Sequence, residues 1–254
     1  MNDAPAGPAI PRPAGPLTTV RSLAFVAWMY GLLVVMGLVC APLLLGPRSW
    51  VLPPIHLWRR LVLGGLRVLC GVRIEVRGAE HAPRGPALVA AKHQSMLDTI
   101  APLTLMADPA YVLKQELMRL PVYAWYVRKA DMIPIDREAN AKTLRALIAA
   151  ARVKLAAGRP VVIFPEGTRQ EPGAAPDYKP GVAALYRDLD VPCTPMATNS
   201  GRCWPAHGFV RRPGVAVFEF LPPIPRGLKR AEFMARLETA IETASNRLLA
   251  SPAP

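Results

Sequence analysis

Short apolar stretches alternate with amphipathic helical patterns along most of the chain. From residue 72 onward, seven apolar or β-branched runs have the length of strands, at 72–76, 87–91, 111–113, 132–135, 161–164, 191–196 and 214–220. Helical periodicity lies at about 140–157, after Lys179-Pro180-Gly181, and at about 230–249. This alternation predicts an α/β domain with a mixed, largely parallel sheet flanked by helices. Ligands of such sheets usually bind outside the carboxyl ends of strands.

The first 71 residues follow a different pattern. Residues 1–16 hold five prolines and little apolar periodicity, which is typical of a disordered tail, and we place that tail at 1–19. Residues 22–47 then carry no charge. A helix of this length, at about 1.5 Å per residue, is long enough to cross a hydrocarbon core of roughly 30 Å. A cleaved signal peptide is the competing interpretation, but no small-x-small cleavage site is evident.

Residues 50–71 mix tryptophan and leucine with three arginines. This composition favours an amphipathic helix at the membrane interface, so 20–71 is predicted to form membrane-anchoring helices. The alternative is that 50–71 packs on the following domain, and both can hold together. Residues 1–71 contain six arginines and one aspartate, and four of the arginines follow the apolar run. The positive-inside rule then places the downstream domain, residues 72–254, on the cytoplasmic side of the inner membrane.

The composition excludes several classes of protein. The chain has 254 residues, 52% of them hydrophobic, and a formal net charge of +13, so it is not intrinsically disordered. Four cysteines without a CxxC pair and four histidines without HExxH predict neither a disulfide scaffold nor a metal site. Neither common nucleotide-binding loop is present, and the lack of GxSxG argues against a lipase or esterase. No cofactor is therefore expected.

The positive charge has several possible sources. Arginine outnumbers lysine 24 to 7, and genomic base composition alone can produce such an excess. The functional interpretations are an anionic membrane, a phosphate-bearing substrate or nucleic acid. A non-enzymatic basic protein that docks on membranes or nucleic acid remains an alternative, but it has no basic run of five or more residues.

Polar residues follow the ends of several predicted strands. The run at 87–91 leads into His93 and Asp98, which cannot face each other on one helix but can do so if His93 lies in a loop and Asp98 in the first helical turn. Such an aspartate would fix the tautomer of the histidine and leave its other nitrogen as a base. Ser95 and Asp98 also have the spacing of a capping box, so a purely structural role is the alternative.

Two further strand ends carry charges, and a third is broken by prolines. Asp136 and Arg137 follow the strand at 132–135, either as an anion contact or as a surface ion pair of little energetic value. The strand at 161–164 leads into Pro165-Glu166-Gly167-Thr168-Arg169. Arginine there suits a phosphate, and glycine permits close backbone approach; a local turn with a Glu–Arg pair is the alternative. The prolines at 191–196 indicate an irregular strand that lines a site.

Together these blocks resemble the phospholipid/glycerol acyltransferase family, most closely its bacterial 1-acyl-glycerol-3-phosphate acyltransferases. His93 and Asp98 match the HxxxxD block, and Phe164 to Arg169 match FPEGTR letter for letter. Asp136-Arg137 and Val191–Pro195 match the second and fourth blocks in the expected order. Asp131 stands where relatives often have glycine before the second block. The blocks cover about 87–196, and the family domain would cover about 72–225.

The resemblance implies roles for the matching positions. His93 would be the general base and Asp98 its orienting partner, in direct attack by the acceptor hydroxyl without an acyl-enzyme. The implied acceptor-binding residues are Lys114, Arg137, Glu166, Gly167, Thr168, Arg169 and Lys179. The implied acyl donor is acyl-CoA or acyl-carrier protein, the acceptor is lysophosphatidate, and the product is phosphatidic acid. Lyso-ornithine lipid, another lysophospholipid or glycerol-3-phosphate remain alternative acceptors. The implied partners include an anionic membrane and no nucleic acid.

Overall fold

Seven strands form one mixed sheet in a computed structural model that describes residues 15–104, 106, 108–136 and 141–251. The strand order is β1-β7-β6-β2-β5-β3-β4, and every pair is parallel except β6 with β7. This confirms the mixed, largely parallel sheet and all seven predicted strands. Their bounds are β1 Val72–Arg77, β2 Leu88–Ala91, β3 Ala110–Lys114, β4 Ile133–Ile135, β5 Val161–Ile163, β6 Cys193–Thr198 and β7 Gly214–Phe220.

Seven α-helices accompany these strands in the described part of the chain. The helices expected at about 140–157, after Gly181 and at about 230–249 are present as α5, α6 and α7, and the helical turn expected at Asp98 is present as α3, but α4 was not predicted. Its sequence has seven residues with no clear apolar stripe, so its place against the rest of the protein decides its conformation. The helices are α1 Pro16–Val39, α2 Leu52–Cys70, α3 Leu97–Ile100, α4 Tyr123–Lys129, α5 Ala141–Ala156, α6 Gly181–Leu189 and α7 Arg230–Ala250.

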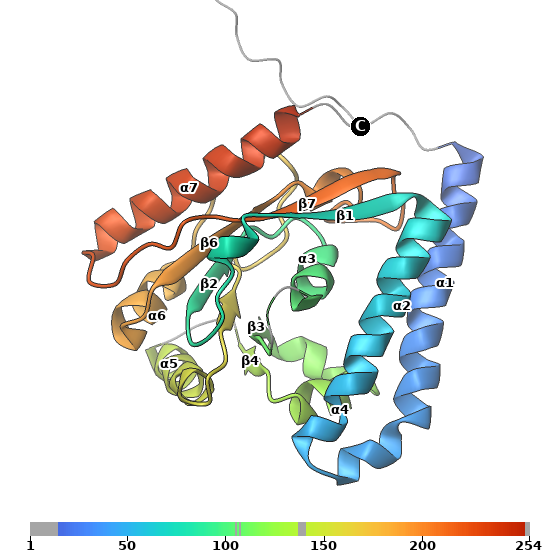
Figure 1. Ribbon diagram of the computed structural model, residues 1–254, viewed down its shortest axis with the longest axis horizontal. Helices are drawn as coiled ribbons and strands as arrows, with labels where there is room; N and C mark the ends of the chain where they lie inside the picture. The colour runs from blue at the N-terminus through green and yellow to red at the C-terminus, as the bar shows by residue number, and fades with distance from the viewer. Residues whose placement is uncertain (1–14, 105, 107, 137–140, 252–254) are drawn as a thin grey trace, which may run out of the picture.

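The sheet separates two apolar layers. Along β2, Val89 and Ala91 join the cluster that includes α1, α2 and α3, whereas Leu88 and Ala90 join the cluster that includes α5, α6 and α7. The alternation follows from the strand repeat of two, which sends successive side chains to opposite faces. Because both faces are covered, β2 is buried along its whole length. Figure 1 shows α5, α6 and α7 on one side of the sheet and the pair α1–α2 on the other.

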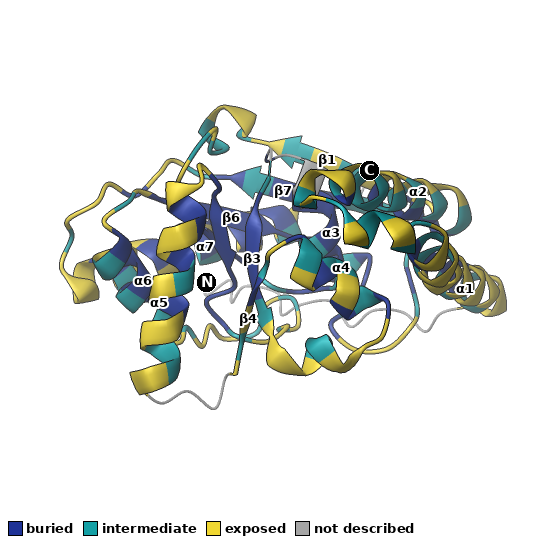
Figure 2. Cartoon of the chain, turned by 90° about the horizontal axis from the view of Figure 1, so that it is seen from below, coloured by how far each residue is buried: buried dark blue, intermediate teal, exposed yellow. Residues whose placement is uncertain are grey.

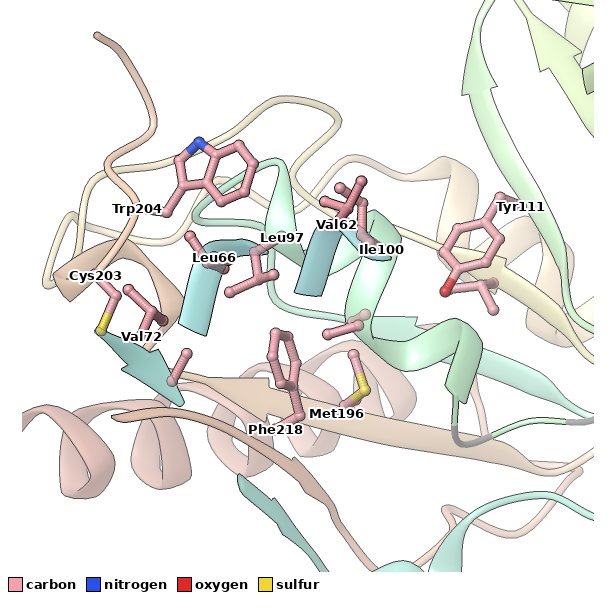
Figure 3. Close-up of a cluster of buried hydrophobic side chains, with 14 of the residues drawn as sticks. Val62, Leu66, Val72, Leu97, Ile100, Tyr111, Met196, Cys203, Trp204 and Phe218 are labelled. Atoms are coloured by element: carbon pink, nitrogen blue, oxygen red, sulfur yellow. The ribbon is translucent and has the colours of Figure 1, made fainter. Parts of the chain in front are cut away.

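The first two long helices form a hairpin against the domain. They lie side by side in Figure 1 and are joined by residues 40–51. The inner face of α2 buries Arg59, Val62, Leu66 and Cys70, whose spacing of three to four residues follows the helical repeat. Figure 3 shows Val62 and Leu66 beside Leu97 of α3 in the buried cluster. Packing of 50–71 on the domain is therefore confirmed, and Arg59 points inward rather than toward a membrane interface.

Helix α1 is mostly exposed. It begins at Pro16, earlier than the predicted tail boundary at residue 19, because proline fits the first turn of a helix, where its missing N–H is not needed. The helix ends at Val39, so residues 40–47 are not part of it, and at 24 residues it is about 36 Å long. Among the described residues it alone is long and apolar enough to cross a membrane, and 22% of its most apolar window is buried. Figure 2 shows its largely exposed surface.

Two residues that lie on either side of α4 have positive backbone φ angles. Asp131 has φ 57°, and aspartate tolerates this conformation better than most residues. Val122 has φ 61°, which is strained for a β-branched residue. Its buried side chain packs against Gly37 of α1, and the hydroxyl of Tyr126 donates to the Gly37 carbonyl at 2.9 Å. These contacts fix α4 on α1.

Candidate active site

His93 and Asp98 face each other at the carboxyl end of β2. His93 lies in the loop after the strand, and Asp98 lies in the first turn of α3. Nδ1 of His93 is 3.1 Å from Oδ2 of Asp98. This is the arrangement that the sequence required for a functional pair. In the tautomer that carries its proton on Nδ1, this contact is a hydrogen bond to the carboxylate, and Nε2 is left with its lone pair.

The Asp98 carboxylate is buried and held by several further donors. The backbone N–H groups of Gln94 and Ser95 donate to Oδ2 at 2.6 and 2.8 Å. The hydroxyls of Ser95, at 3.3 Å, and Ser200 contact Oδ1. Asp98 therefore accepts from the backbone of the turn and also contacts the His93 ring, so this geometry is compatible with both interpretations of the sequence motif.

The His93 imidazole is fixed from its face as well as its edge. The ring stacks on Phe164 with a centroid distance of 4.0 Å and an interplanar angle of 21°. The Gln170 N–H donates to the His93 carbonyl at 2.8 Å, which ties the histidine loop to the segment after β5. The side chain is 12% exposed, so solvent or a ligand can reach it.

The segment Pro165–Arg169 turns sharply away from β5. Gly167 adopts φ +71°, and its N–H donates to the Phe164 carbonyl at 3.0 Å. A side chain at this backbone conformation would be strained, which explains the glycine. Thr168 and Arg169 follow it and are exposed. The turn therefore projects two polar side chains beside His93.

Glu166 does not lie where the resemblance implied. Its side chain is fully buried, with Oε1 at 2.6 Å from Nζ of Lys92 and Oε2 at 2.9 Å from the His93 N–H. Burial raises the pKa of this carboxyl, and the nearby Lys92 ammonium opposes that shift. Both oxygens are used inside the protein, because buried polar groups require partners. In this structure Glu166 supports the loop of His93 and does not line the cavity described next.

A large apolar cavity opens beside this pair. Its volume is about 630 Å³, within the range of small-molecule sites of roughly 300–1,000 Å³. His93, Thr168 and Arg169 line it, together with Lys114 at the end of β3. The remaining wall is mainly apolar and aromatic and comes largely from α1, α2, α3, β3 and α4; it includes Tyr30, Leu33, Met36, Pro54, Ile55, Trp58, Tyr123 and Tyr126. The cavity thus has basic side chains on one part of its wall and apolar space for a hydrocarbon chain.

The remaining predicted site residues lie elsewhere. Lys179 is exposed and pairs with Asp177, and it does not line the cavity, although its Cγ is 3.6 Å from the position of a Cβ on Gly167. Arg137 lies outside the described residues. Asp136 is described, and it lines a small polar pocket with Gln115, Glu116 and Arg119. Among the described residues, no group of three or more His, Cys, Asp or Glu side chains is arranged to hold a metal.

Comparisons with known proteins agree with this geometry. The family profile described as Acyltransferase matches residues 73–199, half of the chain. The chain belongs to the acyltransferase family. It is 35% identical over 157 residues to a 1-acyl-sn-glycerol-3-phosphate acyltransferase of Pseudomonas aeruginosa, and 30% identical over 171 residues to the human alpha form of that enzyme. These matches cover 62% and 65% of this chain, but only 61% and 60% of the relatives' own length.

The acyltransferase fold is also seen in a solved structure. The crystal structure of the 1-acyl-sn-glycerophosphate acyltransferase from Thermotoga maritima aligns with a TM-score of 0.74 at 22% identity. The alignment covers 91% of this chain and 99% of the other. The likeness extends beyond the family profile and shows that the two chains share a fold.

Sequence reasoning missed several residues that support the loop and the carboxylate of the His93–Asp98 pair. Lys92 contacts Glu166, and Glu242 contacts Lys92. Ser200 contacts Asp98. Of these residues, only Lys92 could have been noticed in the sequence, because it is a lysine at the end of an apolar strand, directly before His93. Ser200 and Glu242 lie beyond the end of the profile match, and no local pattern marks them.

Proposed function

We propose that this acyltransferase moves a fatty acyl chain from an acyl thioester to the sn-2 hydroxyl of 1-acyl-glycerol-3-phosphate, which forms phosphatidic acid. The observation that carries the proposal is the oriented His93–Asp98 pair on the wall of a large apolar cavity. A lipid-modifying enzyme needs both features, because the reacting groups are polar and the chains attached to them are not. The activity for which the relatives are named is consistent with this chemistry.

The His93 imidazole is the general base. The acceptor oxygen bonds to the thioester carbonyl carbon while its proton passes to Nε2 of His93. The tetrahedral intermediate then collapses, the carbon–sulfur bond breaks, and the imidazolium returns the proton to the leaving thiolate. Asp98, bonded to Nδ1, orients the ring and stabilises its positive charge while the proton is held.

Attack by the acceptor is direct, without an acyl-enzyme. Ser95 is buried, and its hydroxyl bonds to Asp98, Ser200 and the Leu97 N–H. None of the four cysteines lines the cavity, and burial raises the pKa of the Cys193 and Cys203 thiols. None of these groups is therefore placed or activated as a nucleophile. Acid quenching with a radiolabelled acyl donor should recover no labelled protein; a stable label on Ser95 or a cysteine would contradict direct attack.

Arg169, Lys114 and Thr168 bind the acceptor phosphate, and Gly167 lets it approach the backbone. The first three line the cavity together with His93, and no hydrogen bond or ion pair holds Arg169 in the described part of the structure. An arginine grips phosphate with two parallel hydrogen bonds. Arg137 and Lys179 are further candidates from the family pattern. No cofactor takes part, and the donor is acyl-CoA or acyl-carrier protein.

Helix α1 anchors the enzyme in an anionic membrane, with the catalytic domain on the cytoplasmic side of the inner membrane. Exposed apolar side chains along α1 support this, among them Leu17, Val20, Leu23, Val34, Val35, Leu38 and Val39. The cavity also reaches α1 through Tyr30, Leu33 and Met36, so a chain can enter from the bilayer. Single cysteines introduced near residues 10 and 50 should report the orientation by their labelling from each side; labelling of both from outside alone would contradict it.

The first test is thiol release from acyl-CoA by purified protein in detergent micelles, with lysophosphatidate as acceptor. Turnover with this acceptor that disappears in His93→Ala is expected. Lyso-ornithine lipid, another lysophospholipid, glycerol-3-phosphate and a sample without acceptor form the other arms. A faster reaction with one of these would keep the mechanism and correct the acceptor. If no acceptor supports turnover, either with acyl-CoA or with acyl-carrier protein as donor, the proposed function is contradicted.

A further inference from the structure

A buried cluster of charges connects helix α7 to the loop of the general base. Lys92 is 2% exposed, and its ammonium lies 2.6 Å from Oε1 of Glu166. The same nitrogen lies 2.8 and 3.0 Å from the two carboxylate oxygens of Glu242. A buried ammonium needs acceptors for its three N–H groups. Here two glutamates from different parts of the chain supply them.

The cluster continues directly to the backbone of His93. Glu166 uses Oε1 for Lys92 and Oε2 for the His93 N–H, at 2.9 Å. Its side chain is wholly buried, so water cannot replace either partner. Any shift of Lys92 therefore moves Glu166 and, with it, the backbone that carries the imidazole.

Tyr178 ties the loop after β5 to the same cluster. Its hydroxyl donates to Oε1 of Glu242 at 2.8 Å. The neighbouring Lys179 N–H donates to the Pro165 carbonyl at 2.8 Å, next to Glu166. Glu242 thus receives donors from both loops that border the active site, and it does so from a helix near the carboxyl terminus.

We propose that Glu242 is a positioning residue for His93 and acts through Lys92 and Glu166, with Tyr178 holding Glu242 in place. The inference rests on the proposed function for its kinetic readout. Two carboxylates share one ammonium, so each depends on the geometry of the other. Without Glu242, Lys92 loses two of its three acceptor contacts and moves relative to Glu166. The His93 ring then leaves the alignment that proton transfer requires.

The test compares Glu242→Ala with Glu238→Ala, a matched change one turn earlier on α7. Glu238 is exposed and makes no hydrogen bond or ion pair in the described part of the structure. We expect Glu242→Ala to lower kcat by about 10- to 100-fold with KM for lysophosphatidate within about threefold, because positioning acts on the transition state. Glu242→Gln keeps an acceptor oxygen for Lys92 and should restore kcat to within about fivefold. Unchanged kcat in Glu242→Ala, or a change confined to KM, would overturn the proposal.

A second measurement does not depend on turnover. Hydrogen exchange of the peptide that contains His93 should be about tenfold faster in Glu242→Ala and unchanged in Glu238→Ala. If the wild-type protein acylates no acceptor, this measurement still decides the proposal, so failure of the function and failure of the positioning role are distinct. If Glu242→Ala does not fold, Tyr178→Phe should give a smaller loss of kcat and faster exchange at the same peptide. Wild-type values for both quantities in that variant would overturn the proposal.

Discussion

The hydroxyl of Ser200 donates a hydrogen bond to Oδ1 of Asp98, although 102 residues separate the two positions. The other carboxylate oxygen, Oδ2, lies 3.1 Å from Nδ1 of His93. With a partner on each oxygen, the Asp98 carboxylate cannot rotate without losing a hydrogen bond. The orientation of the imidazole therefore depends on the loop after β6 as well as on its own loop.

Removal of the Ser200 hydroxyl should reduce catalysis without abolishing folding. A hydrogen bond to a charged group contributes about 1.5–3 kcal/mol, so Ser200→Ala is expected to lower kcat by roughly tenfold or more. Ser245→Ala is the matched control, since the buried Ser245 hydroxyl has no hydrogen-bond partner in the described part of the structure. Equal kcat values for the two variants, measured by thiol release, would show that Ser200 does not support the pair.

Loss of the base or of its partner should have the largest effect. His93→Ala and Asp98→Asn are each expected to lower kcat by about three to four orders of magnitude, as for other histidine–carboxylate pairs. An asparagine cannot hold the proton on Nδ1 as a carboxylate does, so Nε2 would no longer accept. His207 is exposed, and His207→Ala should behave like the wild type. Comparable rates for all three variants would exclude the His93–Asp98 mechanism.

Arg169→Ala should weaken the use of phosphate-bearing acceptors. Loss of a charge-assisted hydrogen bond predicts a rise in KM for lysophosphatidate of about 10- to 100-fold. Acylation of 1-acylglycerol, which lacks the phosphate, should change little. Arg73→Ala serves as the control, because Arg73 is exposed on β1 and does not line the cavity. An unchanged KM for lysophosphatidate in Arg169→Ala would remove Arg169 from the acceptor site.

Two glycines of α1 should respond in opposite directions to alanine. A Cβ on Gly37 would lie 2.1 Å from Cγ1 of Val122, whereas a Cβ on Gly31 would meet nothing within 4 Å. Overpacking predicts a loss of about 1–3 kcal/mol in the free energy of unfolding for Gly37→Ala. Gly31→Ala should be neutral or stabilising by up to about 1 kcal/mol, because alanine favours helix. Measurement of the free energy of unfolding in detergent micelles tests this. Equal values for the two variants would show that Val122 does not pack tightly against α1.

Local patterns predicted the elements and the reactive pair. The continuous apolar run at 161–164 and the helical repeat in 140–157 depend on residues within a few positions of one another, so the sequence carries them directly. His93 and Asp98 are five residues apart, and a loop followed by a helical turn brings them together. The helix α4 was missed because its seven residues carry no periodic signal, and Arg137 lies outside the described residues.

Contacts between distant segments were decided by the tertiary structure alone. Glu166 and Glu242 lie 74 and 150 residues from Lys92, yet both bind its ammonium. Such pairs depend on strand order and on how α7 packs over the sheet, and no short repeat encodes either. This is why the sequence predicted Glu166 as a substrate contact, whereas the structure places it beneath the loop. The sequence by itself determined the elements and the spacing that lets His93 meet Asp98, and the packed fold determined which residues hold that pair, because burial requires each charged group to have a partner, which can come from any segment that the fold brings near.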